Sequence, residues 1–284
     1  MREYDFTVYD WDSAVAGGFG EPDRFASYGA AGTALSVGGF DGMHAGHDAL
    51  FNAVLARTDL LPGIVTFAKP PRALRHPAVF EGAVSTLAQR LDICREKGFA
   101  FAVVIDFSGE FGRMEGSTFL SILADTFCMK FLAEGPDFRC GYKGSADIDV
   151  IRTFTEKRGV VLDVIEPVVI DGERVSSTRI RAAVAAGDFF GAERLLRRPF
   201  RLDCSLFRWE RSAPDVLTAE AGADGARTVQ VLPPDGEYEV RALCRENGFL
   251  QPQTAIFCRK SRKITVRFTR GTAGEALAAV DFTA

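Results

Sequence analysis

The sequence predicts an α/β protein, with a doubly wound parallel sheet followed by a second, smaller antiparallel β domain. Three observations lead to this fold class. Apolar runs alternate with helix-like stretches from residue 34 to about residue 200. A glycine-rich turn follows the first of these runs, and after residue 200 short turn-bounded strands replace the alternation. A continuous apolar run between helices is typical of a parallel strand buried on both faces.

The elements of the first domain follow from this alternation in order. The apolar runs predict strands at residues 34–38, 63–67, 101–107, 129–135 and 160–167. The stretches between them predict helices at residues 84–97, 115–126 and 148–158, and Gly98 and Gly159 stand where glycines commonly end helices. Sheets of this kind bind ligands beyond the carboxyl ends of their strands, and the segment from Gly38 to His47 leaves one of those ends.

After residue 200 the pattern predicts a small antiparallel β unit. Strands are expected at residues 238–244, 254–258 and 263–268, separated by turn-rich segments at 232–237 and 245–248. We therefore expect a domain boundary near Arg201, with domains at residues 1–200 and 201–284. Residues 219–226 read as a loop, and residues 1–33 carry no assignable role.

The bulk composition excludes several classes of protein. A length of 284 residues suggests one large domain or two smaller ones, and a formal net charge of −4 gives no general attraction to nucleic acid or an anionic membrane. The six cysteines are scattered without metal-ligand spacing. The N-terminus does not resemble a signal peptide, and no apolar run is long enough to span a membrane. We expect reduced thiols and a cytoplasmic location.

The turn GGFDGMHAGH, at residues 38–47, carries the strongest functional signal. A strand, a glycine-rich turn and a helix start form a site where backbone N–H groups and the helix dipole can hold phosphate. His44 and His47 would add donors aimed at negative charge, although two such histidines could also be core or capping groups. The chain has three histidines, so two in one turn favour the functional reading. The third, His76, lies in a proline-rich stretch and is expected on a surface loop.

A second cluster, ERVSSTRIR at residues 173–181, places hydroxyl side chains at a predicted helix start. The plain interpretation is a capping sequence with exposed arginines. The same residues would also make a triphosphate clamp beside a helix N-terminus; the arginines are Arg174, Arg179 and Arg181. The cluster follows the fifth strand and is expected at the same sheet edge as His47. The two clusters together predict one nucleotide site.

Another basic patch comprises Arg194, Arg197, Arg198 and Arg201. Solvated faces or domain-interface charges account for it better than nucleic-acid contacts, given the acidic balance of the chain.

These clusters, in this order, resemble the HxGH nucleotidylyltransferase superfamily, and most closely the FAD synthetase module of bacterial bifunctional riboflavin kinase/FMN adenylyltransferases. The first motif of that family, G-x-F-D-G-x-H-x-G-H, is matched by Gly38, Phe40, Asp41, Gly42, His44, Gly46 and His47. GPDFRCG at residues 135–141 and DGERVSSTRIR at residues 171–181 resemble its later motifs, and VTF followed by Pro71-Arg72 resembles its second strand and turn. The resemblance covers residues 34–200 and implies a Rossmann-like sheet.

The resemblance implies that the FMN phosphate attacks the α-phosphorus of ATP, giving FAD and pyrophosphate with Mg²⁺. The implied partners are ATP and FMN, with no nucleic acid or membrane; metal ligands and oligomeric state stay unassigned. The implied catalytic residues are His44, His47, Arg174, Ser177 and Arg181. The implied nucleotide-binding residues are Gly38, Gly39, Phe40, Asp41, Gly46, Asp137, Ser176 and Thr178.

Two departures from the family pattern matter. The turn that often reads E-P-H-P is Ala68-Lys69-Pro70-Pro71 here, so the histidine is missing. After Arg201 the chain lacks the glycine-rich loop and P-T-A-N signature of the kinase module, and only residues 233–242 faintly resemble that module. We therefore expect a degenerate kinase-like barrel without riboflavin kinase activity.

Two alternatives remain open from the sequence. One is another HxGH adenylyl- or cytidylyltransferase that acts on a non-flavin phosphate. The other is a non-catalytic flavin-nucleotide binding protein, against which the intact His44/His47 pair and the 176–181 cluster argue.

Overall fold

The computed structural model describes residues 4–19, 29–70, 73, 80–107, 109–222, 229–246, 249–269 and 276–283. His76 and the Pro71-Arg72 turn lie outside the described residues. Contacts divide the chain into two compact units. The first contains residues 1–40, 46–75 and 90–174, and the second contains residues 41–45, 76–89 and 175–284. The domain boundary near Arg201 stays a prediction.

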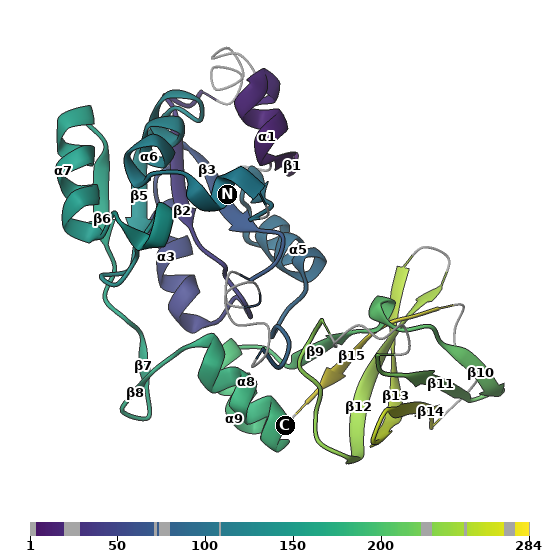
Figure 1. Cartoon of the computed structure of the whole chain (residues 1–284). Coiled ribbons are helices and arrows are strands. Elements are labelled where there is room, and N and C mark those ends of the chain that lie inside the picture. The colour runs from purple at the N-terminus through teal and green to yellow at the C-terminus, as the bar shows by residue number, and fades with distance from the viewer. Residues whose placement is uncertain are drawn as a thin grey trace. The chain divides into compact units, whose positions relative to one another are not determined.

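The first unit is built on a six-stranded parallel sheet with the order β1-β4-β3-β2-β5-β6 (Figure 1). The strands are β1 (Thr7–Asp10), β2 (Thr33–Val37), β3 (Leu61–Phe67), β4 (Phe101–Ile105), β5 (Met129–Glu134) and β6 (Val161–Val164). The helices are α1 (Trp11–Ser13), α3 (Ala45–Leu55), α5 (Leu87–Lys97), α6 (Gly116–Asp125) and α7 (Ile148–Arg158), with the shorter turns η1 (Ala14–Gly18), η2 (Gly109–Arg113) and η3 (Tyr142–Gly144). A two-stranded ribbon of β7 (Val169–Ile170) and β8 (Glu173–Arg174) follows.

The strand order puts the topological switch point at β2. From β2 the chain moves to β3 on one side, and later to β5 on the other side. Open α/β sheets bind ligands in the crevice that such a reversal leaves beyond the carboxyl ends of the strands. The α/β fold class is confirmed, and all five expected strands are present; β1, from the segment without an assigned role, adds the edge strand beside β4.

Aromatic side chains fill the core on one face of this sheet. Trp11 stacks on Phe119 of α6, with ring centroids 5.6 Å apart, and lies 5.6 Å from Phe127. This cluster continues to Phe101 of β4 and Ile151 of α7. The phenylalanines of this cluster thus supply packing that offsets the conformational entropy lost on folding.

Two buried polar side chains hold the chain where β2 ends. Glu134 is 2% exposed and accepts a hydrogen bond from the Val37 N–H at 2.5 Å. Arg90 is 1% exposed and donates to the Gly39 carbonyl at 3.0 Å and to the Thr66 hydroxyl at 2.7 Å. The turn after β2 is therefore fixed by its own sheet, in keeping with the rule that buried polar groups are hydrogen-bonded.

Helix α5 begins three residues later than the sequence predicted. Residues 84–86 form no helical turn because the Val84 and Ser85 N–H groups donate to the Asp41 carboxylate. The helix instead starts with a reciprocal capping box: the Gln89 N–H donates to the Thr86 hydroxyl, and the Thr86 N–H donates to the Gln89 side chain.

The second unit joins two helices to a seven-stranded antiparallel sheet with the order β10-β11-β14-β13-β12-β15-β9. The helices are α8 (Ser177–Ala186) and α9 (Phe189–Leu196), with a short turn η4 (Cys204–Leu206). The strands are β9 (Phe200–Asp203), β10 (Glu210–Ala213), β11 (Val216–Glu220), β12 (Gly236–Glu246), β13 (Phe249–Lys260), β14 (Lys263–Phe268) and β15 (Ala276–Phe282). The three expected strands lie within β12, β13 and β14, which confirms the antiparallel β region.

A second aromatic core supports this sheet. Phe189 of α9 stacks on Phe282 of β15 at 4.5 Å, and Phe257 of β13 meets the Phe282 ring edge at 5.0 Å.

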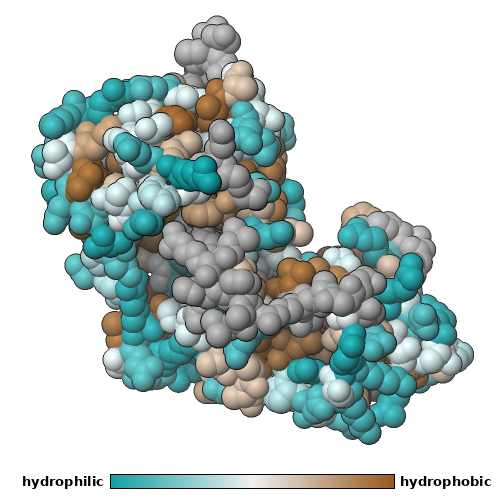
Figure 2. All heavy atoms as spheres, viewed as in Figure 1, coloured by the Kyte–Doolittle hydropathy of each residue, from teal (hydrophilic) through white to brown (hydrophobic). Residues whose placement is uncertain are grey.

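Hydrophilic residues cover much of the visible surface, with hydrophobic side chains exposed in patches (Figure 2). All six cysteines are free thiols, as expected.

The buried Glu134 carboxyl predicts a pH dependence of stability. Burial raises the pKa of Glu134 well above its ordinary value of 4.5, so the folded protein keeps a proton that the unfolded chain releases. The contribution of this carboxyl to the free energy of unfolding is therefore full below pH 4.5 and falls as pH rises towards the folded-state pKa. Glu134→Gln keeps the acceptor and removes the titration. In urea unfolding from about pH 4 to pH 8, the stability of the variant relative to wild type should rise with pH, by about 1.4 kcal/mol per unit of pKa shift.

The exposed Glu156→Gln change on α7 serves as the control and should show no such trend. A Glu134→Gln difference that stays constant with pH would contradict the neutral buried carboxyl.

Candidate active site

The turn after β2 has an unusual backbone. Gly38 donates its N–H to the Val65 carbonyl at 3.0 Å, and a Cβ at Gly38 would lie 2.9 Å from the Phe40 ring. Phe40 and Met43 both have a φ of 44°, in the left-handed region that non-glycine residues rarely adopt. Such residues persist only where the surrounding structure holds them, and they cluster at functional sites.

His47 lies in the first turn of α3, half-buried, in the first unit. Its ring meets the Phe40 ring edge at 5.3 Å and stacks over Phe51 at 6.2 Å, with an interplanar angle of 26°. Phe51 is fully buried, so the two aromatic rings limit the orientations open to the imidazole. The helix start predicted at this point is confirmed, and Gly46 lies in the same first turn.

His44 and Asp41 belong to residues 41–45 of the second unit, and both are buried, His44 at 5% and Asp41 at 6% exposure. The Asp41 carboxylate accepts hydrogen bonds from the Val84 N–H at 2.8 Å and the Ser85 N–H at 3.0 Å. Its second oxygen accepts from the Arg181 guanidinium at 2.8 Å. The carboxylate, expected beside nucleotide, thus lies in a buried ion pair that organises the loop.

The cluster at the start of α8 divides into residues with different surroundings. Ser176 caps the helix by accepting from the Arg179 N–H at 3.3 Å, as its sequence position predicts. The Ser177 hydroxyl donates to the Asp41 carbonyl at 2.8 Å. Thr178 is exposed, while Arg181 is 7% exposed and also donates to the Gly82 carbonyl at 2.7 Å.

Arg198 was grouped with charges on solvated faces or interfaces, but its guanidinium contacts the motif. It donates to the Gly42 carbonyl at 2.7 Å and to the Met43 carbonyl at 3.1 Å. These are the carbonyls of a strained turn, and a guanidinium with five N–H groups can satisfy several of them at once. No periodicity in the sequence signals this contact, because α9 ends just before Arg198 and the bond depends on the tertiary fold.

Asp137 and Arg174 are brought together in the first unit. The guanidinium of Arg174, at the end of β8, donates to both carboxylate oxygens of Asp137 at 2.8 and 2.9 Å. The hydrogen bond and charge of Arg174 lower the pKa of Asp137, and Asp137 in turn raises the pKa of Arg174. Both side chains are exposed, so this bidentate pair is open to exchange with an anionic ligand.

Within the described ranges, no group of three or more His, Cys, Asp or Glu side chains could hold a metal ion. A magnesium ion commonly rests on one or two carboxylates and on substrate phosphates. No helix in the part of the chain that the structure describes is long and apolar enough to cross a membrane.

Comparison with known proteins identifies relatives for the region that carries both motifs. The model of a family described as FAD synthetase matches residues 28–179. The bifunctional riboflavin kinase/FMN adenylyltransferase of Pseudomonas fluorescens is 30% identical over 213 residues, which cover 74% of this chain and 68% of the relative. The protein of that name from Escherichia coli (strain K12) is 28% identical over 216 residues, covering 75% and 68%.

One solved structure matches nearly the whole chain. A macrolide-efflux protein from Streptococcus pneumoniae superposes with a TM-score of 0.75 and 19% identity, covering 99% of this chain and 91% of that one. At this identity the likeness shows the fold alone.

The Asp41–Arg181 pair predicts a large effect on stability. Asp41→Ala leaves a buried guanidinium without this carboxylate and two backbone N–H groups without their acceptor. We expect a loss of about 3–5 kcal/mol in the free energy of unfolding, measured in urea. Asp41→Asn keeps one acceptor oxygen and should lose less.

Asp59→Ala removes a surface ion pair with Arg57 and serves as the control. Its expected loss is much smaller, because exposed ion pairs contribute little to stability. Equal losses for Asp41→Ala and Asp59→Ala would show that the buried pair does not organise the loop.

Proposed function

We propose that this chain, which belongs to the FAD synthetase family, transfers the adenylyl group of ATP to FMN and releases FAD and pyrophosphate. The observation that carries this proposal is the family match over residues 28–179, which contains the turn at residues 38–47 and the second cluster as far as Arg179. The relatives at 28–30% identity have names that include the same adenylyltransferase activity.

In the proposed reaction the FMN phosphate oxygen attacks the α-phosphorus of ATP, and the bond to the pyrophosphate oxygen breaks. No covalent intermediate on the protein is required. The rate enhancement would come from alignment of the two substrates and from donors aimed at the charge that develops on the phosphates. His47, at the start of α3, and His44 would supply such donors, with the N-terminus of α3 adding its dipole.

The contacts of the other motif residues support a division of labour. Asp41, Ser177 and Arg181 would act mainly by holding the loop at residues 41–45, since each is hydrogen-bonded within it or to it. Arg174, exposed and paired with Asp137, would be able to exchange that carboxylate for phosphate. Thr178, exposed at the start of α8, would contribute its hydroxyl to phosphate binding.

Magnesium would arrive with ATP and offset charge on its phosphates. Since the described residues contain no three-ligand cluster, its donors would be mostly phosphate oxygens and water. We assign no step to it.

Riboflavin kinase activity is proposed to be absent, because the second unit lacks the P-T-A-N signature and its glycine-rich loop. The purified protein, incubated with ATP and Mg²⁺, should form FAD from FMN and no FMN from riboflavin, as resolved by chromatography. Accumulation of FMN from riboflavin would refute the loss of kinase activity. Bound flavin without turnover would favour a non-catalytic binding protein, and turnover of only a non-flavin phosphate would favour another superfamily reaction.

His47→Ala should lower the rate of FAD formation by about 10²–10³-fold, because a donor to developing charge is lost. Asn52→Ala, an exposed change on the same helix, is the matched control and should leave the rate unchanged. Circular dichroism should show the same fold for both. Near-wild-type turnover by His47→Ala would remove this imidazole from the mechanism.

A further inference from the structure

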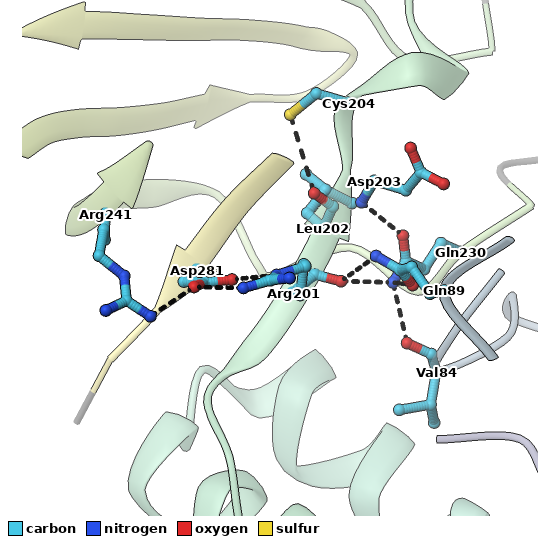
Figure 3. Close-up of polar contacts among 9 residues, drawn as sticks. All are labelled: Val84, Gln89, Arg201, Leu202, Asp203, Cys204, Gln230, Arg241 and Asp281. Carbon is cyan, nitrogen blue, oxygen red and sulfur yellow. Dashed lines mark hydrogen bonds and ion pairs between the residues drawn. The ribbon is translucent and has the colours of Figure 1, made fainter. Parts of the chain in front are cut away.

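Gln230 is fully buried and bridges two backbone segments of the second unit, β9 and the segment at Val84 (Figure 3). Its amide nitrogen donates to the Val84 carbonyl at 2.9 Å and to the Arg201 carbonyl at 2.7 Å. Its amide oxygen accepts from the Asp203 N–H at 2.9 Å. A side chain that both donates and accepts is needed here, and glutamine has both functions in one neutral group.

Two further contacts tie residues 83–86 to the antiparallel sheet. Ala83 forms a parallel bridge beside Gln230: the Ala83 N–H donates to Val229, and the Val231 N–H donates to the Ala83 carbonyl, each at 2.8 Å. The Thr86 hydroxyl donates to the Asp203 carboxylate of β9 at 2.8 Å. The segment is thus fixed on one side by β9 and the strand-like segment around Gln230.

The other side of the same segment holds the motif. Val84 and Ser85 donate their N–H groups to Asp41, and the Ser85 hydroxyl accepts from the Gly42 N–H at 2.8 Å. The Val84 carbonyl therefore accepts a hydrogen bond from Gln230, and the Val84 N–H donates to Asp41. The segment at residues 83–86 is therefore hydrogen-bonded on one side to β9 and Gln230, and on the other side to the loop that contains His44.

Strand β9 is itself firmly held. It pairs with β15, and the Arg201 guanidinium donates to both oxygens of the Asp281 carboxylate at 2.6 and 2.9 Å. Asp281 is 1% exposed and also accepts from Arg241 of β12 at 2.8 Å (Figure 3). Strand β9, which Gln230 contacts, is therefore held in place by its own neighbours.

We propose that Gln230 is a positioning residue for adenylyl transfer, through which the C-terminal sheet sets the loop at residues 41–45. The proposal rests on the proposed function. Gln230 touches no reacting atom. It positions the Val84 and Ser85 N–H groups, which hold Asp41. Through Asp41 it positions the backbone of the loop that contains His44.

The test compares Gln230→Met, which keeps the length of the side chain but loses the amide donors and acceptor, with Val266→Ala in β14. Val266 is fully buried in the same sheet, on a strand that pairs with β11 and β13 and not with β9. We expect kcat for FAD formation to fall at least about tenfold in Gln230→Met, with a smaller change in KM. Amide hydrogen exchange at Val84 and Ser85 should quicken in that variant and stay near wild type in Val266→Ala.

Unchanged turnover and exchange in Gln230→Met would overturn the proposal. So would equal losses of kcat in the two variants at equally lowered melting temperatures. If wild-type protein forms no FAD, the proposed function fails, and the exchange rates still decide whether Gln230 holds the segment.

If Gln230→Met does not fold, Thr86→Val and Thr86→Ser provide the same comparison at the neighbouring link. The valine variant loses the hydroxyl that donates to Asp203 and accepts from the Gln89 N–H, and the serine variant retains both contacts. Loss of turnover and faster exchange in Thr86→Val, with recovery in Thr86→Ser, supports the relay; wild-type behaviour of Thr86→Val overturns it.

Discussion

The buried carboxylate of Asp41 is the interaction on which the motif loop depends. A charge removed from water is costly unless each of its oxygens is matched by donors, and here Arg181, Val84 and Ser85 supply them. Because these donors come from α8 and from residues 84–85, the Asp41 carboxylate joins α8, the loop at residues 41–45 and the segment before α5. The same constraint makes the left-handed backbone of Met43 tolerable, because its neighbours hold it in place.

The two compact units hold successive parts of the same motif. In the first unit, Glu134 and Arg90 hold the backbone at Val37 and Gly39. In the second, Arg198 and Ser177 hold the carbonyls that follow. The imidazole of His47 adds aromatic contacts of its own. A turn held in this way suits the proposed reaction, whose catalysis would rest on alignment and charge stabilisation.

Much of the fold could be predicted from periodicity, and much less of the site. Long buried strands and strong helix ends stand out in the sequence, whereas β10 is short and polar and β15 is rich in alanine, which is depleted in strands. The motif residues were recognisable, including Ser177 and Arg181, which hold Asp41, but other partners of the motif were not. Three of these partners lie far from the motif in sequence: Arg90, Arg198 and Gln230. Each binds backbone groups that come within reach only in the tertiary fold. The Thr86/Gln89 capping box was the one local signal available for the true start of α5.

The amide of Gln230 has a consequence for how such a chain can evolve. It binds main-chain groups, which every residue type except proline provides in full, so the sheet around it can change in sequence while its backbone stays in place. Deletion of the sheet would instead remove β9, the strand to which Gln230 ties the segment that holds the loop. Selection on such a sheet would then act on the position of its backbone more than on the chemistry of its side chains.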